Sequence, residues 1–421
     1  MEYTASEVLS YIEDNDVKFI KLLFTDIYGN IKSLTVQPSI LKSTFERGVS
    51  FDANAVKGFL HVNESDLFIM PDPSTLSVLP WRPQHGRVAR LYCNINYPDG
   101  RPFEGDSRLI LKKVMDRCRT MGYDVKVGTE CEFYLFRPDE NGNPALTPSD
   151  FAGYCDLAPL DKGENVRRDI VLTLEQMGIT PEASHHESGP GQNEIDFKYD
   201  TALRAADNVT TFKNVVKTIS AQDGFFASFT PKPWDDKPGS GLHINLSLYR
   251  GNENCYAKST PDSDSFTAGI LSHIKEITAF LNPLRQSYKR LGSFEAPKYI
   301  SWSRQNRSQL IRVPAASDDR SRIELRSPDC SCNQYLALAL IVAAGLDGIE
   351  KKMELPPAVD LDLYTADKKA TEGLETLPET LNEALDLARN SQFVKSVISG
   401  QTLESYIQEK AGDRDPEFWE I

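Results

Sequence analysis

The sequence predicts an α+β protein in which a small N-terminal domain precedes a large domain built on one curved antiparallel sheet backed by helices. The chain has 421 residues, which is too long for one compact core. Short β-rich runs and turns fill it up to Pro102. From Ser107 onward, amphipathic helices alternate with strands of strict period two. We therefore expect domains at residues 1–102 and 103–421.

Composition narrows the class of protein. A hydrophobic content of 40% with 26% charged residues is typical of a soluble globular chain. A net charge of −14 argues against binding to nucleic acid or to an anionic membrane surface. Seven cysteines without a CxxC pair indicate free thiols. Because the N-terminus is acidic and has no apolar h-region, we expect a cytoplasmic protein without a secretory signal.

The first elements are a helix and a hairpin. Residues 1–16 read as a helix, with Thr4 as N-cap and Glu7 completing a capping box. Two β-rich runs follow, Val17 to Asp26 and Ile31 to Val36, around the turn signal Tyr28-Gly29-Asn30.

Apolar residues spaced three and four apart mark the later helices. The expected helices are Arg108 to Met121, Leu157 to Met177, Ala202 to Gln222, Ser263 to Phe280, Gln334 to Met353 and Glu379 to Ile398. The apolar run inside the helix that starts at Gln334 is too short to span a bilayer, so we expect that helix to be buried.

The stretch from Ala183 to Tyr199 contains a second hairpin signal, Gly189-Pro190-Gly191. A turn centred between Pro190 and Gly191 would place Glu187 opposite Glu194. Directly opposed carboxylates are unfavourable in an ordinary sheet. Either the two side chains extend into water, or a cation lies between them.

Four period-two segments each carry one polar face: residues 130–136, 194–199, 242–248 and 322–326. For any one strand, a polar face in water is the simpler interpretation. Four such faces, rich in Glu and His, favour a shared concave face. We expect that face to collect Glu130, Glu132, Glu187, Glu194, His243 and Glu324.

Five carboxylates and an imidazole in one cavity cannot all stay ionised without cations, because each buried charge raises the pKa of its neighbours. Oxygen-rich ligands suit Mg²⁺ or Mn²⁺, and this set could serve about two or three such ions. The chain has no Walker A sequence, so a nucleotide would be held by metals and arginines. Such arginines occur late in the chain: Arg307, Arg312, Arg322 and Arg326.

Several long motifs resemble the glutamine synthetase family of the bacterial and archaeal type. They are FTDIYGNIK, GTECEFYLF, DLAPLDKGENVRRDIVLTLEQMGI, ASHHESGPGQNEIDFKY, GSGLHINLSL, NRSQLIR and RSRIELRSPDCSCN, and they extend over nearly the whole chain. The resemblance implies an N-terminal β-grasp domain and a catalytic domain with a bowl-shaped sheet. It also implies a dodecamer of two hexameric rings, with active sites between neighbouring subunits.

The resemblance assigns a role to each candidate residue. It implies metal ligands at Glu130, Glu132, Glu187, Glu194, His243 and Glu324, and an ammonium site at Asp52 of a neighbouring subunit, Tyr154 and Glu187. It implies glutamate and phosphate contacts at Gly239, Arg290, Arg307 and Arg326, and ATP contacts at Asn245, Ser247, Arg312 and Arg322. Glu295 resembles the flap glutamate that shields the intermediate, so Asp52, Glu295 and Arg307 are the implied catalytic residues.

The implied reaction forms L-glutamine from L-glutamate and ammonia, with ATP as co-substrate and a γ-glutamyl phosphate intermediate. Four positions depart from the family pattern. Pro238 replaces an asparagine that helps to hold glutamate, the flap before Glu295 is one residue short, and a serine is lost in Asp52-Ala53-Asn54-Ala55. His61 replaces an arginine used in feedback inhibition. The alternatives are a γ-glutamyl ligase that uses an amine or a different acid, and a weakly active regulatory homologue.

Overall fold

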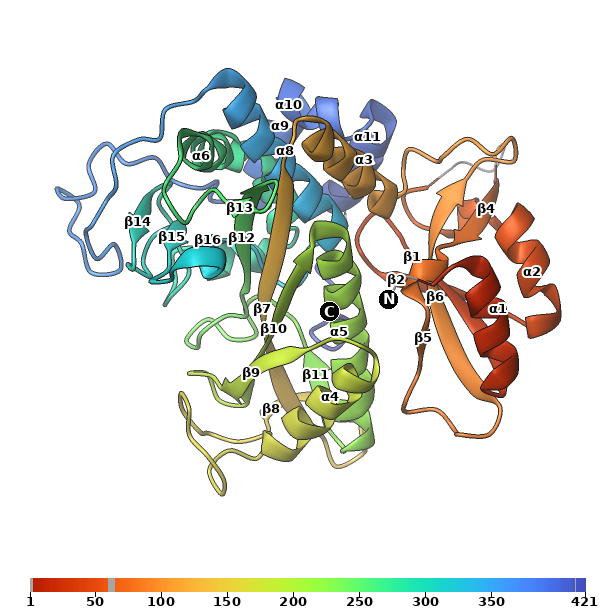
Figure 1. The fold of residues 1–421 in the computed structure, drawn as a ribbon. Helices are drawn as coiled ribbons and strands as arrows, with labels where there is room; N and C mark the ends of the chain where they lie inside the picture. The colour runs from red at the N-terminus through yellow and green to blue at the C-terminus, as the bar shows by residue number, and fades with distance from the viewer. Residues whose placement is uncertain (1–2, 60–64, 413) are drawn as a thin grey trace.

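The computed structural model describes residues 3–59, 65–412 and 414–421, so His61 lies outside the described residues. Figure 1 shows a small sheet with the N-terminal helices on one side of the molecule and a larger sheet with its helices on the other. The expected α+β fold is confirmed. Within the described ranges, none of the helices combines the length and apolar character needed to cross a bilayer.

The small sheet has the strand order β2-β1-β6-β4-β3, with β5 paired to β6. Its β1 and β6 are parallel, and the other pairs are antiparallel. The capping box between Thr4 and Glu7 is present at the start of the first helix, as the sequence predicted. The elements are α1 (Ala5–Asp14), β1 (Val17–Thr25), β2 (Ile31–Val36), α2 (Pro38–Arg47), β3 (Val49–Asp52), η1 (Ala53–Ala55), β4 (Asp66–Pro71), η3 (Pro73–Thr75), β5 (Ser77–Val78) and β6 (Arg87–Asn96).

The large sheet has the order β14-β15-β16-β12-β7-β10-β9. Its pairs are antiparallel except β14 with β15, which are parallel. The strands are β7 (Asp124–Pro138), β8 (Pro144–Pro148), β9 (Pro181–His186), β10 (Gln192–Thr201), β11 (Phe226–Ser228), β12 (Leu242–Arg250), β13 (Glu253–Asn254), β14 (Trp302–Arg304), β15 (Ile311–Val313) and β16 (Ile323–Leu325).

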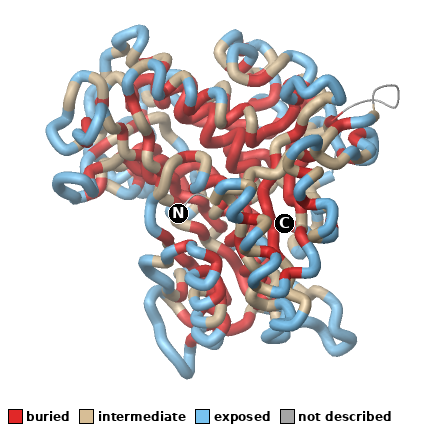
Figure 2. The backbone as a smooth tube through the Cα atoms, turned by 45° about the vertical axis from the view of Figure 1, so that its right-hand side comes forward, coloured by how far each residue is buried: buried red, intermediate tan, exposed pale blue. Residues whose placement is uncertain are grey.

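Helices cover the apolar face of this sheet. On β7, Cys131, Phe133 and Leu135 are fully buried, and Phe212 of α5 packs on the ring of Phe133. Figure 2 shows the buried backbone concentrated in the interior of the molecule, with the exposed residues in the loops around it. The remaining helices are α3 (Ser107–Thr120), α4 (Glu164–Gln176), α5 (Ala202–Gln222), α6 (Pro261–Leu281), α7 (Arg285–Arg290), η4 (Asp318–Arg320), α8 (Gln334–Lys351), α9 (Leu381–Asn390), α10 (Gln392–Val397) and α11 (Gly400–Gly412).

Two expected helices depart most from the predicted bounds. The helix predicted from Leu157 begins only at Glu164, because the carboxylate of Asp161 accepts the N–H of Gly163, the N-cap residue, and holds the preceding turn outside the helix. The helix predicted over 379–398 is two helices, α9 and α10. They separate at Ser391, whose hydroxyl caps α10 by accepting the N–H of Val394.

The predicted pairing of Glu187 with Glu194 is wrong. The N–H of Gln192 donates to the carbonyl of Gly189 and closes the turn. The carbonyl of Gln192 accepts the N–H of Glu187, so Glu187 lies opposite Gln192, two residues away from the predicted partner Glu194. The slip occurs because side chains take the intervening donors: Glu187 Oε2 accepts the N–H of Ser188, and Gln192 Oε1 accepts that of Gly189. Glu194 therefore lies opposite His185. A two-residue slip keeps Glu187 on the same face.

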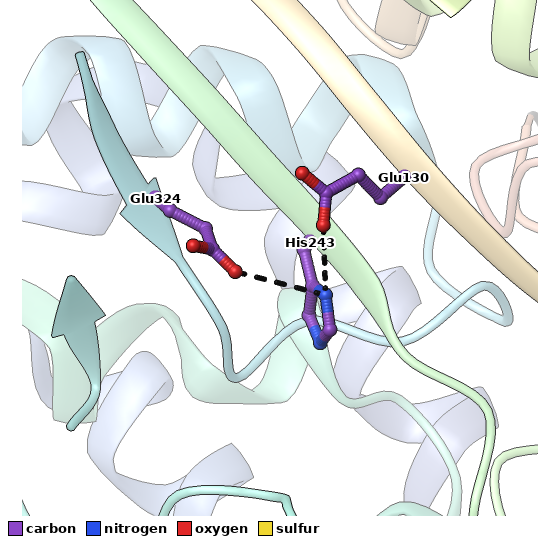
Figure 3. Close-up of side chains that lie close together, drawn as sticks. All are labelled: Glu130, His243 and Glu324. Atoms are coloured by element: carbon purple, nitrogen blue, oxygen red, sulfur yellow. Dashed lines mark hydrogen bonds and ion pairs between the residues drawn. The ribbon is translucent and has the colours of Figure 1, made fainter. Parts of the chain in front are cut away.

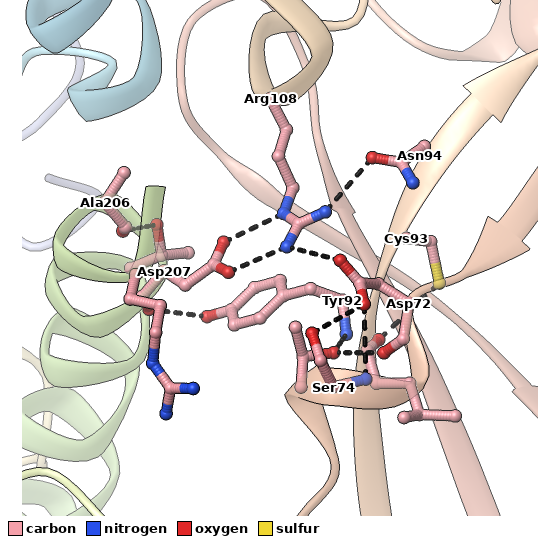
Figure 4. A network of polar contacts seen from close by, with 12 residues as sticks. Asp72, Ser74, Tyr92, Cys93, Asn94, Arg108, Ala206 and Asp207 are labelled. Carbon is pink, nitrogen blue, oxygen red and sulfur yellow. Dashed lines mark hydrogen bonds and ion pairs between the residues drawn. The ribbon is translucent and has the colours of Figure 1, made fainter. Parts of the chain in front are cut away.

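A buried arginine joins the small sheet to a helix that backs the large one (Figure 4). Arg108, in the first turn of α3, donates from Nε and Nη2 to Asp207 of α5 at 3.0 and 2.9 Å. The same guanidinium donates to Asn94 of β6 and to Asp72, each at 3.0 Å. These contacts fix the small sheet against the helical layer that backs the large one.

Candidate active site

The predicted metal ligands all lie on one face of the large sheet. β7 carries Glu130 and Glu132. The other four ligands lie on β10, β12 and β16 and just after β9. The strand register places Glu130 opposite His243 on one side, and Glu132 opposite Glu194 on the other. Glu324 on β16 and Glu187, just after β9, complete the face.

The first cluster joins Glu130, His243 and Glu324 (Figure 3). His243 Nδ1 lies 3.2 Å from Glu130 Oε2 and 3.8 Å from Glu324 Oε1. Asn245 Nδ2 donates to the other oxygen of Glu130 at 2.9 Å and so fixes the plane of that carboxylate. One potential ligand atom from each member of the cluster lies within 4.8 Å of the others.

A second cluster shares His243, whose Nε2 lies 3.8 Å from Glu132 Oε1, and also includes Glu194. The third consists of His185, Glu187 and Glu194. His185 Nε2 lies 3.0 Å from Glu187 Oε1 and 3.8 Å from Glu194 Oε1. The sequence interpretation missed His185. Its position on β9, two residues before Glu187 and so on the same face, was the signal that could have found it.

The electrostatics of this face fit divalent cations. Burial, followed by the charges of Glu132, Asp196, Glu130 and Glu187, raises the pKa of Glu194 to about 11. Burial and the charge of Glu130 raise the pKa of Asp196 to about 7, and Asp196 Oδ1 is buried without a hydrogen-bond partner. By contrast, burial alone would raise the pKa of Glu130, but the hydrogen bonds from His243 and Asn245 together with the charges of His243 and Arg326 outweigh it and lower that pKa to about 2. An acidic oxygen donor set with an unpartnered carboxylate is what Mg²⁺ or Mn²⁺ requires.

Arginines border the carboxylates on one side. Glu324 accepts hydrogen bonds from Arg326 and, at 2.5 Å, from Arg312 Nη1. Arg290 is buried and donates to the carbonyl oxygens of Ser327 and Arg326 at 2.7 and 3.2 Å. Beside the clusters is a cavity of about 110 Å³. Its lining includes Glu132, Glu187, Pro238, Gly239, His243, Arg290, Glu295 and Arg326.

The residues expected to contact ATP adjoin the first cluster. Arg322 Nε donates to Asn245 Oδ1 at 2.8 Å, and Asn245 in turn holds Glu130. Ser247, two residues further along β12, donates to the carbonyl of Ser321 at 3.0 Å. The middle of β12 and the residues that lead into β16 therefore carry this polar group together.

Glu295 and Arg307 lie on exposed loops that share one partner. The hydroxyl of Tyr364 is 2.7 Å from the carbonyl oxygen of Glu295 and 2.7 Å from that of Arg307. Glu295 lines the cavity, whereas Arg307 does not belong to its lining.

The structure brings together only part of the expected ammonium site. The ring of Tyr154 packs edge-on against His185 with centroids 5.3 Å apart, next to Glu187. The side chain of Asp52 instead caps its own short helix η1, accepting the N–H of Asn54 at 3.0 Å. It belongs to the small sheet and is not part of the cavity lining in this chain.

Known proteins resemble the chain along its whole length. Residues 16–98 match the family model for the glutamine synthetase β-grasp domain, and residues 104–417 match that for the glutamine synthetase catalytic domain. The glutamine synthetase of Methanosarcina mazei is 45% identical, with 98% of this chain and 94% of that protein aligned. That of Clostridium saccharobutylicum is 43% identical, with 98% and 96% aligned.

Solved structures agree with these matches. A GmaS–ADP complex superposes with a TM-score of 0.87 at 29% identity, covering 96% of this chain and 94% of that one. The glutamine synthetase of Plasmodium falciparum gives a TM-score of 0.87 at 25% identity, covering 98% and 96%.

Proposed function

The chain belongs to the glutamine synthetase family and is an ATP- and divalent-metal-dependent ligase that forms glutamine, and we propose that the acidic face of the large sheet is its active site. The observation that carries this proposal is the chain of three overlapping carboxylate–imidazole clusters on that face. We also propose that residues 1–102 and 103–421 are its two domains.

We assign the first cluster, Glu130, His243 and Glu324, to one metal ion. Glu132, Glu187 and Glu194 hold a second, and His185 and Asp196 adjoin it. Two ions, or three, fit this number of oxygen donors, with Mg²⁺ or Mn²⁺ as the candidates. When bound, such ions neutralise the phosphates of ATP and the charge that develops on the transferred phosphoryl group.

The arginines complete the phosphoryl-transfer site. The side-chain carboxylate of glutamate attacks the γ-phosphorus of ATP, and ADP leaves. Arg290 and Arg326 in the cavity lining, with Arg307 on the loop held by Tyr364, orient the acid and the phosphoryl oxygens, and Gly239 contacts the substrate from the same lining. Asn245, Ser247, Arg312 and Arg322 lie along β12, β15 and β16, where they contact the nucleotide.

Ammonia then attacks the γ-carbonyl carbon, and phosphate leaves. Ammonium binds as a cation at Glu187 and Tyr154, and Asp52 of a neighbouring subunit takes its proton. Glu295 covers the acyl phosphate against water. A homo-oligomer, which we propose is a dodecamer of two hexameric rings, provides the neighbour. Seven free cysteines support a reducing, cytoplasmic location.

The deciding experiment measures ADP release from ATP with Mg²⁺ across a panel of carboxylic acids, each with ammonium or a primary amine. We expect release to require glutamate and ammonium together and to yield glutamine. Release with an amine but not with ammonium would favour a related γ-glutamyl ligase, which Pro238 in the cavity lining makes the second candidate. A lack of turnover with every pair would favour a regulatory homologue.

A further inference from the structure

One loop beside the site has little apolar packing to hold it. Residues 151–160 connect β8 to the turn before α4, and they expose large apolar side chains to solvent: Phe151 by 86%, Leu157 by 72%, and Leu160 and Tyr154 by 61% each. The shape of this loop therefore depends on its hydrogen bonds. Because the loop carries Tyr154, those bonds decide where Tyr154 lies relative to Glu187.

The carboxylate of Asp150 accepts hydrogen bonds from both ends of this loop. This carboxylate is 3% exposed. Its Oδ1 accepts the N–H of Ala152 at 3.3 Å, and its Oδ2 accepts that of Lys162 at 2.8 Å, so both ends of the loop converge on one side chain. Oδ1 also accepts the N–H of Gly191, in the turn that follows Glu187, at 3.1 Å.

His186 connects this carboxylate to Glu187. The imidazole is fully buried, with Nε2 2.8 Å from Asp150 Oδ1 and Nδ1 2.6 Å from the carbonyl oxygen of Glu187. Both neighbours are acceptors, so each ring nitrogen donates a proton. The carbonyl of His186 in turn accepts the N–H of Cys155, the residue next to Tyr154, at 2.9 Å.

We propose that His186 and Asp150 are positioning residues for the ammonia step, holding Glu187 and the Tyr154 loop in register with each other. The proposal rests on the ammonium site proposed above and goes beyond it, because neither residue touches a reacting atom. The same contacts explain why the nearby acidic group of Asp150, Asp161 and His186 is not assigned a metal: Asp150 is bound by His186, and Asp161 by Arg167.

The test compares three single variants of the full-length protein: His186→Gln, Asp150→Asn and the control His273→Gln. His273 makes a matching buried bond, Nε2 to Asp347 Oδ2 at 2.7 Å, between helices α6 and α8. We expect His186→Gln and Asp150→Asn to raise the KM for ammonium by about 10- to 100-fold, the usual cost of losing a partner that orients a ligand. The KM for glutamate and for ATP should rise less than that for ammonium, because Arg290, Arg312 and Arg326 are held by Glu324 and by the carbonyl groups of residues 326 and 327. The control should change none of them.

A double variant sharpens the result. If the two residues act as one unit, His186→Gln combined with Asp150→Asn should raise the KM for ammonium little more than either change alone. An unchanged KM for ammonium, an equal rise for glutamate, or the same rise in His273→Gln would overturn the proposal.

Hydrogen exchange on the wild-type protein gives a readout that does not depend on whether the variants fold. The N–H groups of Ala152, Cys155 and Lys162 should exchange more slowly than those of the exposed turn residues Lys368 and Lys369, although their own loop is also exposed. Equally fast exchange would refute the proposal that Asp150 and His186 hold this loop. If the wild type instead forms no glutamine, the proposed function fails while the exchange result still stands.

Discussion

His243 and Glu130 face each other across strands β12 and β7, with Nδ1 of the imidazole 3.2 Å from Oε2 of the carboxylate. His243 is also the residue that the first and second clusters have in common. Removing either partner therefore affects the centre of the acidic face rather than its edge.

Replacing either residue of this pair should abolish ADP release and leave the fold of the protein unchanged. We expect Glu130→Gln and His243→Asn each to lower Mg²⁺-dependent ADP release by about 100-fold or more, because both alter the ligands that neutralise phosphate charge. Initial rates at saturating ATP and glutamate measure this. Glu140→Gln, on an exposed turn, is the control. Rates near wild type in either variant would contradict the metal assignment.

Asp52 should act on a neighbouring subunit's site. We expect Asp52→Ala to spare formation of acyl phosphate, detected by hydroxylamine trapping, while ammonia-dependent glutamine formation falls. Mixing dissociated Asp52→Ala and Glu324→Ala subunits and reassembling them should restore part of the activity, since some sites then combine two intact halves. No recovery in a correctly assembled mixture would place Asp52 and Glu324 in one chain's site.

Pro238 should limit the affinity for glutamate. Its carbonyl accepts the hydroxyl of Tyr134 at 2.6 Å, and proline offers no side-chain donor to the cavity. Pro238→Asn should lower the KM for glutamate by about tenfold, since a hydrogen bond to a charged group contributes about 1.5 kcal/mol. Pro238→Ala is the matched control for backbone effects. An equal response in both variants would exclude the amide as the cause.

Arg108 should contribute more to stability than any surface arginine. Arg108→Met leaves Asp207 buried without its bidentate partner, and breaking such a pair costs about 3 to 5 kcal/mol. Chemical denaturation followed by fluorescence measures the loss. Arg101→Met, which breaks a solvent-exposed pair with Asp99, should change the midpoint little. Similar midpoints for the two variants would count against the buried network.

His273 should make stability depend on pH. Burial lowers the pKa of His273, but the nearby carboxylates of Glu276, 3.5 Å from Nδ1, and Asp347, hydrogen-bonded to Nε2, outweigh it and raise that pKa above its usual value. The stabilisation is therefore complete below about pH 6.5, the unfolded value, and is lost as pH rises through the folded pKa. Thermal midpoints from about pH 6 to about pH 9 should fall more steeply for the wild type than for His273→Gln. Parallel curves would show that His273 does not titrate with folding.

The sequence was sufficient to predict which face of a strand each side chain lies on, because this depends on periodicity. Alternation along β7 placed Glu130 and Glu132 on one face and Cys131 and Phe133 in the core, because successive side chains on a strand point to opposite faces. It could not give the pairing of Glu194 with His185. That register depends on side chains of Glu187 and Gln192 taking backbone donors in the turn, which no period reveals.

Periodicity in the sequence also could not predict contacts between distant segments. Asp150 and His186 are in hydrogen-bond contact although they lie far apart in the chain. No periodic pattern in the sequence links the two residues. The later start of the expected helix, at Glu164, has a local cause instead, because the carboxylate of Asp161 accepts the N–H of Gly163 two residues further on.

The hydroxyl of Tyr364 lies 2.7 Å from two carbonyl oxygens, those of Glu295 and Arg307, yet it has a single proton to donate. The two loops are therefore rivals for one donor. If the loop of Glu295 moved away from Tyr364, the hydroxyl would donate to the carbonyl oxygen of Arg307 alone, so one hydrogen-bond donor couples the positions of the two loops.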